Sequence, residues 1–258
     1  MGKVARQSVD DEELLYRLFG VNAELLIDHA WGWEPCTIDL IKAYRPETSS
    51  MSSGQVLSQP YTFDKARVVV MEMADAVSLK LVEQRLLTNQ LVLTVSYDRE
   101  SLTRPDIASH YQGEVVLDHY GRPVPKHAHG TANLPAHTSS GKQIIDALMS
   151  LYDSIVNRHL LIRRLNISTN NIIPEERLAQ SVGQQPTTPR QLDLFTDYDT
   201  ARLTEQREKE ERRKERRMQE AVISIKKRFG KNAILKGTSY AEGATAKERN
   251  QQIGGHKA

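Results

Sequence analysis

Apolar residues recur with helical spacing in two stretches of the chain. The first stretch predicts a helix over residues 64–87, and the second predicts a helix that opens with a capping box between Ser140 and Gln143. Spacings of three and four residues place the apolar side chains of each helix on one face. These side chains are Val70, Met73, Val77 and Leu81 in the first helix and Ile144, Leu148, Leu151 and Ile155 in the second.

Strand-like segments lie before, between and after these two helices. Residues 90–97 alternate cleanly between apolar and polar side chains, which is typical of a strand with one buried face. The other β-compatible segments are residues 52–61, 115–118, 124–134 and 160–168, with the second and third joined through Tyr120 and Gly121.

The predicted order is strand, helix, strand, strand, helix, strand. This order is that of the split βαβ, ferredoxin-like arrangement, in which one four-stranded antiparallel sheet carries both helices on one face. We therefore predict an α+β fold for this part of the chain.

Such a sheet has a second face that the helices do not cover. If Leu165 and Ile167 point to the helices, then Arg164, Asn166 and Ser168 face outward, and Arg163 requires a bulge or a place at the sheet margin. The third strand adds the basic side chains Lys126, His127 and His129. A basic face with few aromatic residues suits contacts to phosphates rather than base stacking, although a plain solvated sheet has the same pattern. We predict no metal site at the histidines, because no cysteine cluster or acidic partner accompanies them.

The first 45 residues predict short helices. Asp10 and Glu13 form a candidate capping box, Gly20 ends that helix, and a second helix is expected over residues 22–30. A helix, glycine turn and helix can bind a DNA backbone through their amides, but they are equally a common way to pack helices.

The composition argues against a membrane-spanning protein and against one held by internal disulfides. The chain has 258 residues, of which 39% are hydrophobic and 26% charged, and no run approaches the roughly 20 apolar residues that cross a bilayer. The single cysteine, Cys36, excludes an internal disulfide and suits the reducing cytoplasm. The net charge is +2, yet residues 202–231 contain twelve Lys or Arg and six Asp or Glu, so this segment carries +6 and the remainder −4. The segment is either a binding site for a polyanion or a solvated helix.

A pentapeptide in a polar stretch gives the most specific indication of a partner. Residues 183–190 are rich in Gly, Gln, Thr and Pro, and the next five residues are Gln191, Leu192, Asp193, Leu194 and Phe195. Their apolar side chains have no local core to join, which favours a docking peptide for a groove on another protein over a short helix that folds back. The pattern Gln-Leu-x-Leu-Phe resembles the motif by which bacterial replication and repair proteins bind the ring-shaped sliding clamp.

Other segments extend this resemblance to a family. Together they resemble the thumb, little finger and tail of Y-family translesion DNA polymerases, most closely the UmuC-like (ImpB/MucB/SamB) group of bacterial DNA repair proteins. The resemblance is carried by residues 19–32, 41–44, 52–63, 125–130, 162–166, 191–195, 225–232 and 248–256.

The resemblance implies four parts of the chain. These are a partial helical thumb at residues 1–45, a DNA-binding little finger at 46–175, a linker with the clamp peptide at 176–200, and a charged helix with a flexible tail at 201–258. The carboxylate signatures of the family's palm, which holds two magnesium ions, do not occur in this sequence. We therefore expect a C-terminal portion that needs no cofactor itself and does not synthesise DNA alone.

The resemblance also implies where the chain contacts DNA. The expected function is sequence-independent binding of damaged or primer–template DNA, together with docking on the clamp, in cytoplasmic, nucleoid-associated DNA repair and SOS-type damage tolerance. The alternative is a stand-alone, non-catalytic adaptor for clamp and DNA. No membrane is expected as a partner. The implied DNA contacts are Tyr61, Thr62, Lys126, His127, Arg163 and Arg164 in the little finger, and Gly20, Asn22, Gly32 and Lys42 in the thumb.

Overall fold

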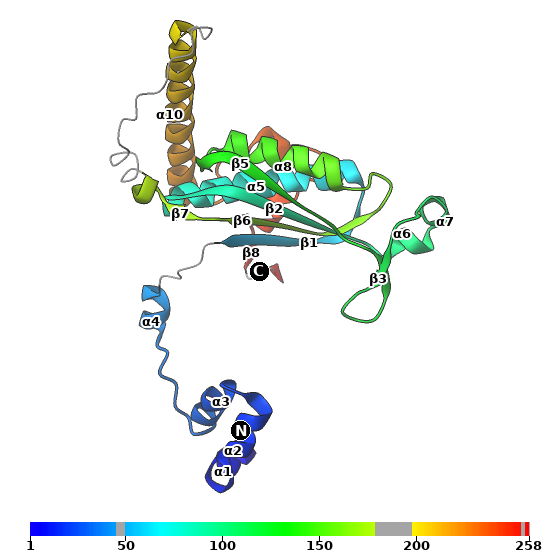
Figure 1. Cartoon of the computed structure of the whole chain (residues 1–258), viewed down its shortest axis with the longest axis vertical. Coiled ribbons are helices and arrows are strands. Elements are labelled where there is room, and N and C mark those ends of the chain that lie inside the picture. Colours follow the sequence, from blue (N-terminus) through cyan, green and yellow to red (C-terminus); the bar gives the residue numbers. More distant parts are fainter. Residues whose placement is uncertain (45–49, 179–197, 254–255, 258) are drawn as a thin grey trace. The chain divides into compact units, whose positions relative to one another are not determined.

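A computed structural model describes residues 1–44, 50–178, 198–253 and 256–257 of the chain. The chain divides into two compact units, Met1–Glu47 and Thr48–Ala258. Figure 1 shows the elements of both units. The predicted clamp peptide, Gln191 to Phe195, lies outside the described residues. In the part of the chain that the structure describes, no helix is long and apolar enough to cross a membrane.

The first unit consists of short helices. They are α1 (Gly2–Asp10), α2 (Glu12–Phe19), α3 (Asn22–Ala30) and α4 (Ile38–Ala43). Asp11, rather than the predicted Asp10, caps α2, because Asp10 still belongs to α1 and the Asp11 carboxylate accepts a hydrogen bond from the Leu14 amide at 3.1 Å. Gly20 ends α2 with a φ of 58°, as its position after the apolar stretch predicts.

The second unit is built around an antiparallel sheet. Its strands are β1 (Met51–Tyr61), β2 (Leu86–Tyr97), β5 (Ala128–Thr138) and β6 (Ile162–Asn170), paired in the order β1-β6-β2-β5. A short strand, β7 (Ile173–Pro174), pairs with the start of β2. The predicted α+β class is confirmed, whereas the exact ferredoxin-like topology is not.

Two helices pack on one face of this sheet. They are α5 (Phe63–Gln84) and α8 (Gly141–Ile155), and both lie on the same side of the strands in Figure 1. The predicted Ser140 cap is confirmed, because its hydroxyl accepts a hydrogen bond from the Gln143 amide at 3.3 Å. Gly130 lets α8 approach β5 closely, since a Cβ there would lie 2.9 Å from the Leu151 side chain.

The core lies between the helices and the sheet, where the sequence pattern places it. All four predicted apolar residues of α5 are buried, and so are Leu165 and Ile167 of β6. At the end of the core, the buried Tyr152 hydroxyl donates a hydrogen bond of 2.8 Å to the Phe63 carbonyl. This bond joins α8 to the first residue of α5.

An insertion follows β2 and ends at β5. It contains α6 (Glu100–Thr103), α7 (Pro105–Ala108) and a hairpin of β3 (Val115–Leu117) and β4 (Pro123–Pro125). The sequence predicted one strand over residues 124–134, but β4 ends at Pro125 and β5 begins only at Ala128. The hairpin is therefore separate from the main sheet.

The C-terminal region packs against the helical layer. The long helix α10 (Tyr198–Phe229) is followed by η1 (Gly237–Tyr240), α11 (Ala246–Arg249), β8 (Gln252–Ile253) and β9 (His256–Lys257). The Glu215 carboxylate of α10 accepts hydrogen bonds from the Ser140 hydroxyl at 2.6 Å and the Lys142 amide at 3.0 Å. Beyond Phe229, the segment expected to be a flexible tail has contacts of its own, because the Glu72 carboxylate of α5 accepts bonds from the amides of Thr245 and Ala246.

Candidate nucleic-acid interface

The face of the sheet that points away from α5 and α8 is largely polar. Because the side chains of a strand alternate, the neighbours of buried Leu165 and Ile167 point away from the helices. The strand register places these residues in rows across the sheet. One row holds Gly54, Asn166, Thr94 and His129, and the next holds Val56, Arg164 and Ser96.

The side chains of these rows are short or polar, and none is Phe, Tyr or Trp. His129 contacts the neighbouring strand through its Nδ1, which lies 3.0 Å from the Thr94 hydroxyl. Short polar side chains allow the phosphate backbone of a nucleic acid to come close and to form hydrogen bonds. Without aromatic rings, these rows offer little for base stacking.

A bulge in β6 lies at the end of this face. Ser96 of β2 pairs with Arg164, but the next residue, Tyr97, pairs with Ile162, so Arg163 is the extra residue. The sequence predicts this bulge or a marginal position, because Arg163 interrupts the alternation of apolar and polar residues. The bulge allows two consecutive arginines to have different surroundings.

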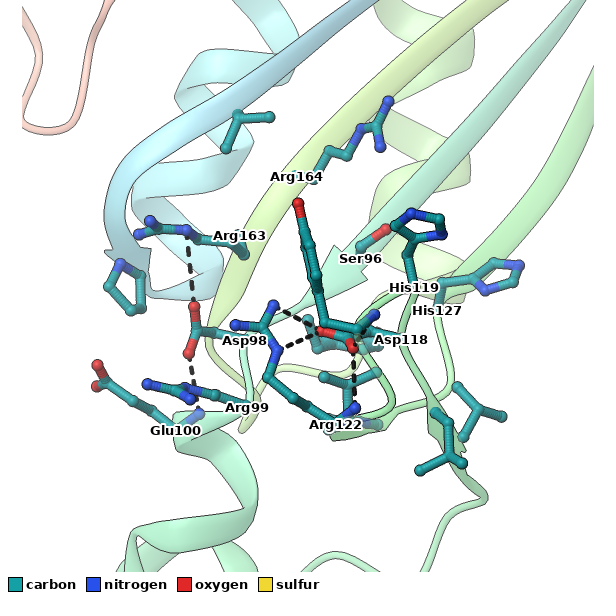
Figure 2. Close-up of a pocket in the computed structure, with 18 residues that line it drawn as sticks. Ser96, Asp98, Arg99, Glu100, Asp118, His119, Arg122, His127, Arg163 and Arg164 are labelled. Atoms are coloured by element: carbon teal, nitrogen blue, oxygen red, sulfur yellow. Dashed lines mark hydrogen bonds and ion pairs between the residues drawn. The ribbon is translucent and has the colours of Figure 1, made fainter.

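A pocket of about 740 Å³ lies at this end of the sheet. Figure 2 shows the side chains that line it. The open face, the residues that follow β2, and the β3–β4 hairpin all contribute to its lining. We call it the basic pocket. Its charged and imidazole side chains are Arg99, Arg122, Arg163, Arg164, His119 and His127, together with Asp98, Glu100 and Asp118.

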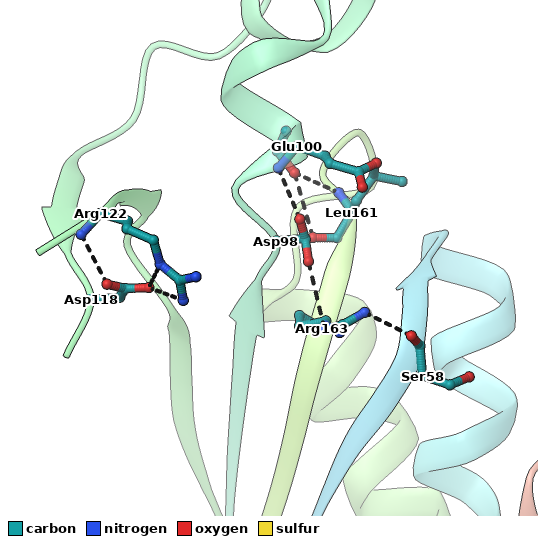
Figure 3. A network of polar contacts seen from close by, with 8 residues as sticks. Ser58, Asp98, Glu100, Asp118, Arg122, Leu161 and Arg163 are labelled. Carbon is teal, nitrogen blue, oxygen red and sulfur yellow. Dashed lines mark hydrogen bonds and ion pairs between the residues drawn. The ribbon is translucent and has the colours of Figure 1, made fainter. Parts of the chain in front are cut away.

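Two of the carboxylates in the basic pocket are used to hold its loops (Figure 3). Asp98 accepts a hydrogen bond from the Glu100 amide at 2.9 Å and faces the Arg163 guanidinium at 3.8 Å. Asp118 accepts bonds from the amides of Tyr120 and Arg122, and its Oδ2 lies 2.7 Å from the Arg122 guanidinium. The hydrogen bond with the Arg122 side chain, followed by the one with its backbone, holds the pKa of Asp118 below the ordinary value.

Arg99 and Arg164 have no such partners. Within the described residues, neither guanidinium makes a hydrogen bond or an ion pair, and both side chains belong to exposed residues. Glu100 is the remaining carboxylate of the basic pocket, and, after the hydrogen bond to Asp106, its charge contributes to raising the pKa of Arg104. The two arginines are therefore available to bind an anion, because their charge is not already neutralised at short range.

The structure brings together some of the predicted little-finger contacts. Arg163, Arg164 and His127 all line the basic pocket. Lys126 is exposed, but its Nζ lies 2.6 Å from the Glu114 carboxylate, and the hydrogen bond to Glu114 raises its pKa. Thr62 is exposed at the N-cap of α5. Tyr61 is buried in the core, and its role in DNA binding stays a prediction.

The four predicted thumb contacts lie in the first unit. Gly20 and Asn22 flank the turn between α2 and α3, Gly32 follows α3 with a φ of 80°, and Lys42 is in the last turn of α4. The role of these four residues in DNA binding stays a prediction.

Several residues of the basic pocket were not singled out from the sequence. They are Asp98, Arg99, Asp118, Tyr120 and Arg122. A signal for the hairpin was present, since Asp at the start of a turn and Gly at its end are typical turn residues. No sequence signal placed this turn beside the bulge of β6.

The described residues contain no candidate metal site, because no group of three or more of their His, Cys, Asp or Glu side chains is placed to hold a metal ion.

Comparison with known proteins identifies the family. Residues 48–194, more than half of the chain, match the model of the impB/mucB/samB family C-terminal domain. A solved structure described as a complex of the beta-clamp processivity factor and the little finger domain of PolIV is similar to the chain, with 9% sequence identity and a TM-score of 0.30. That similarity covers 57% of this chain and 99% of the other. No curated protein sequence gives a significant match. The chain thus belongs to the impB/mucB/samB family of Y-family translesion DNA polymerases and contains the family's C-terminal domain.

Proposed function

We propose that this chain holds primer–template DNA for a translesion DNA polymerase and docks it on a sliding clamp. In this proposal the open sheet face and the basic pocket contact the DNA backbone. The observation that carries the proposal is the position of Arg164, which is exposed on a polar sheet face without an ionic partner among the described residues.

Phosphate contacts fit the needs of such an enzyme. They fix the position of a duplex but carry no sequence information, so a damaged template base does not disturb them. Arg99 and Arg164 supply guanidinium groups that bind phosphate oxygens in a bidentate manner. The small side chains around them, such as Gly54 and Ser96, leave room for the backbone to approach.

The clamp-binding role depends on Gln191 to Phe195. Leu194 and Phe195 would fill an apolar pocket of the clamp, and the Gln191 amide would hydrogen-bond beside it. A short peptide with two apolar anchors has to offset the general costs of association, so the affinity is expected to be modest. A modest affinity suits a polymerase that must leave the primer after a short repair synthesis.

The proposal assigns catalysis to another part of the parent enzyme. The two magnesium ions and the carboxylates that hold them would belong to a palm domain, and this chain would contribute DNA holding and recruitment in the cytoplasm, at the nucleoid. The DNA repair and damage-tolerance role is part of the same proposal.

Fluorescence anisotropy with a labelled primer–template tests the DNA-binding part. We expect binding that weakens steeply between about 50 and 200 mM salt, because phosphate contacts release counterions. Affinity that is flat over this range would contradict the proposal.

A further inference from the structure

The tip of the β3–β4 hairpin is a turn closed by side-chain and backbone hydrogen bonds. The Asp118 carboxylate accepts hydrogen bonds from the amides of Tyr120 and Arg122, both at 2.9 Å. The backbone closes the turn, since the Gly121 amide donates to the Asp118 carbonyl at 2.9 Å and the Asp118 amide donates to the Arg122 carbonyl at the same distance. Gly121 has a φ of 73°, which glycine adopts without strain.

This turn presents a large aromatic side chain to solvent. Tyr120 is 77% exposed and lines the basic pocket. The Arg122 guanidinium lies over its ring, 4.8 Å from the centroid, and the His119 ring meets it edge-on at 5.4 Å. The Arg122 guanidinium that contacts the Tyr120 ring is itself bound to the Asp118 carboxylate.

Other apolar surface lies in the same pocket. Leu117 is 71% exposed and Val56 is 64% exposed, and both contribute to the lining. The basic pocket therefore combines an exposed ring and aliphatic surface with the unpaired guanidiniums of Arg99 and Arg164. An unpaired nucleotide has the complementary chemistry, namely a flat apolar base face and flanking phosphates.

We infer that the basic pocket binds an unpaired base of single-stranded DNA, which stacks on Tyr120 while Arg99 and Arg164 bind the adjoining phosphates. This inference rests on the proposed function and names a further ligand for the same site. Bases inside a duplex already stack on their neighbours, so only an unstacked base can offer its face to a protein ring. The pocket volume of about 740 Å³ is large enough for one nucleotide.

The experiment compares two DNA probes in fluorescence anisotropy. One is a blunt duplex, and the other is the same duplex with a short overhang of unpaired thymidines. We expect the chain to bind the overhang probe about tenfold more tightly, in line with the contribution of one stacked base. Tyr120→Ala should remove this preference for the overhang probe, and Tyr120→Phe should keep it because the ring is retained.

A matched control is Tyr240→Ala, since Tyr240 is 71% exposed and lies in the C-terminal segment, outside the pocket lining. A preference that survives in Tyr120→Ala, or is absent from the unaltered chain, would overturn the inference while duplex binding still supports the proposed function. If the unaltered chain binds neither probe, the inference and the proposed function are both wrong.

Discussion

Arg163 and Arg164 are consecutive residues of β6, yet their side chains have different surroundings. The Arg163 guanidinium lies 3.8 Å from the Asp98 carboxylate and donates a hydrogen bond of 3.1 Å to the Ser58 carbonyl. Arg164 has no such contact among the described residues and points to the open face. The bulge at Arg163 produces this difference, because it shifts one residue out of the alternation.

The two arginines should therefore differ in their contribution to stability. Arg163→Ala is expected to lower the free energy of unfolding by about 1 kcal/mol or less, since its contacts are partly solvent-exposed. Arg164→Ala should change it by no more than about 0.5 kcal/mol. Urea denaturation followed by circular dichroism measures both, and equal destabilisation would contradict the distinction.

The clamp peptide provides a second prediction. Leu194→Ala combined with Phe195→Ala should abolish binding to an immobilised bacterial sliding clamp, because both apolar anchors are lost. Asp193→Ala is the matched control, since position 193 is the variable position of the motif. Surface plasmon resonance that detects unchanged binding by the double variant would rule out this peptide as the docking site.

The C-terminal segment should depend on Glu72. Its carboxylate accepts hydrogen bonds of 2.8 and 3.0 Å from the amides of Thr245 and Ala246, and the side chain is buried. Glu72→Ala should speed hydrogen exchange at these two amides, because their acceptor is removed, while the sheet remains protected. Glu248→Ala, at an exposed position of α11, should leave the exchange unchanged. Equal exchange in both variants would show that Glu72 does not hold the segment.

The hairpin tip should be sensitive to acid through Asp118. Its folded pKa is lowered chiefly by the hydrogen bond with the Arg122 side chain, so the ionised carboxylate supports the turn above the ordinary aspartate pKa of about 4. This support is lost as the pH falls through the lowered folded value.

Nuclear magnetic resonance of the Tyr120 amide follows this transition. We expect its midpoint below the ordinary aspartate pKa, and no such transition in Asp118→Asn. A midpoint at or above about 4 would contradict the role given to Arg122.

The sequence predicted the core of the second unit because apolar periodicity reports directly on burial. Val70, Met73, Val77 and Leu81 are all buried on α5, and Leu91, Leu93 and Val95 are buried on β2. The outward position of Arg164 followed from the same alternation. Tyr61 lies at the end of β1 and joins the same core, because burial of an aromatic ring is favourable.

The basic pocket was harder to predict, because it depends on contacts between distant segments. Asp118 and Gly121 are recognisable turn residues, but the place of their turn in the basic pocket is set by the tertiary position of the hairpin. The docking of the C-terminal segment has the same origin, since Glu72 and Thr245 lie 173 residues apart in the sequence. For residues 202–231, charge composition alone suggested a solvated helix or a polyanion site.

DNA binding by an Arg164 variant tests the central proposal most directly. Anisotropy with a blunt duplex should show that Arg164→Gln weakens binding and reduces the slope of log affinity against log salt by about one unit, the effect of one lost phosphate contact. Lys80→Gln removes the same charge from an exposed position on α5 and should bind like the unaltered chain. If the two variants have the same affinity and the same salt slope, the open face does not hold DNA through Arg164.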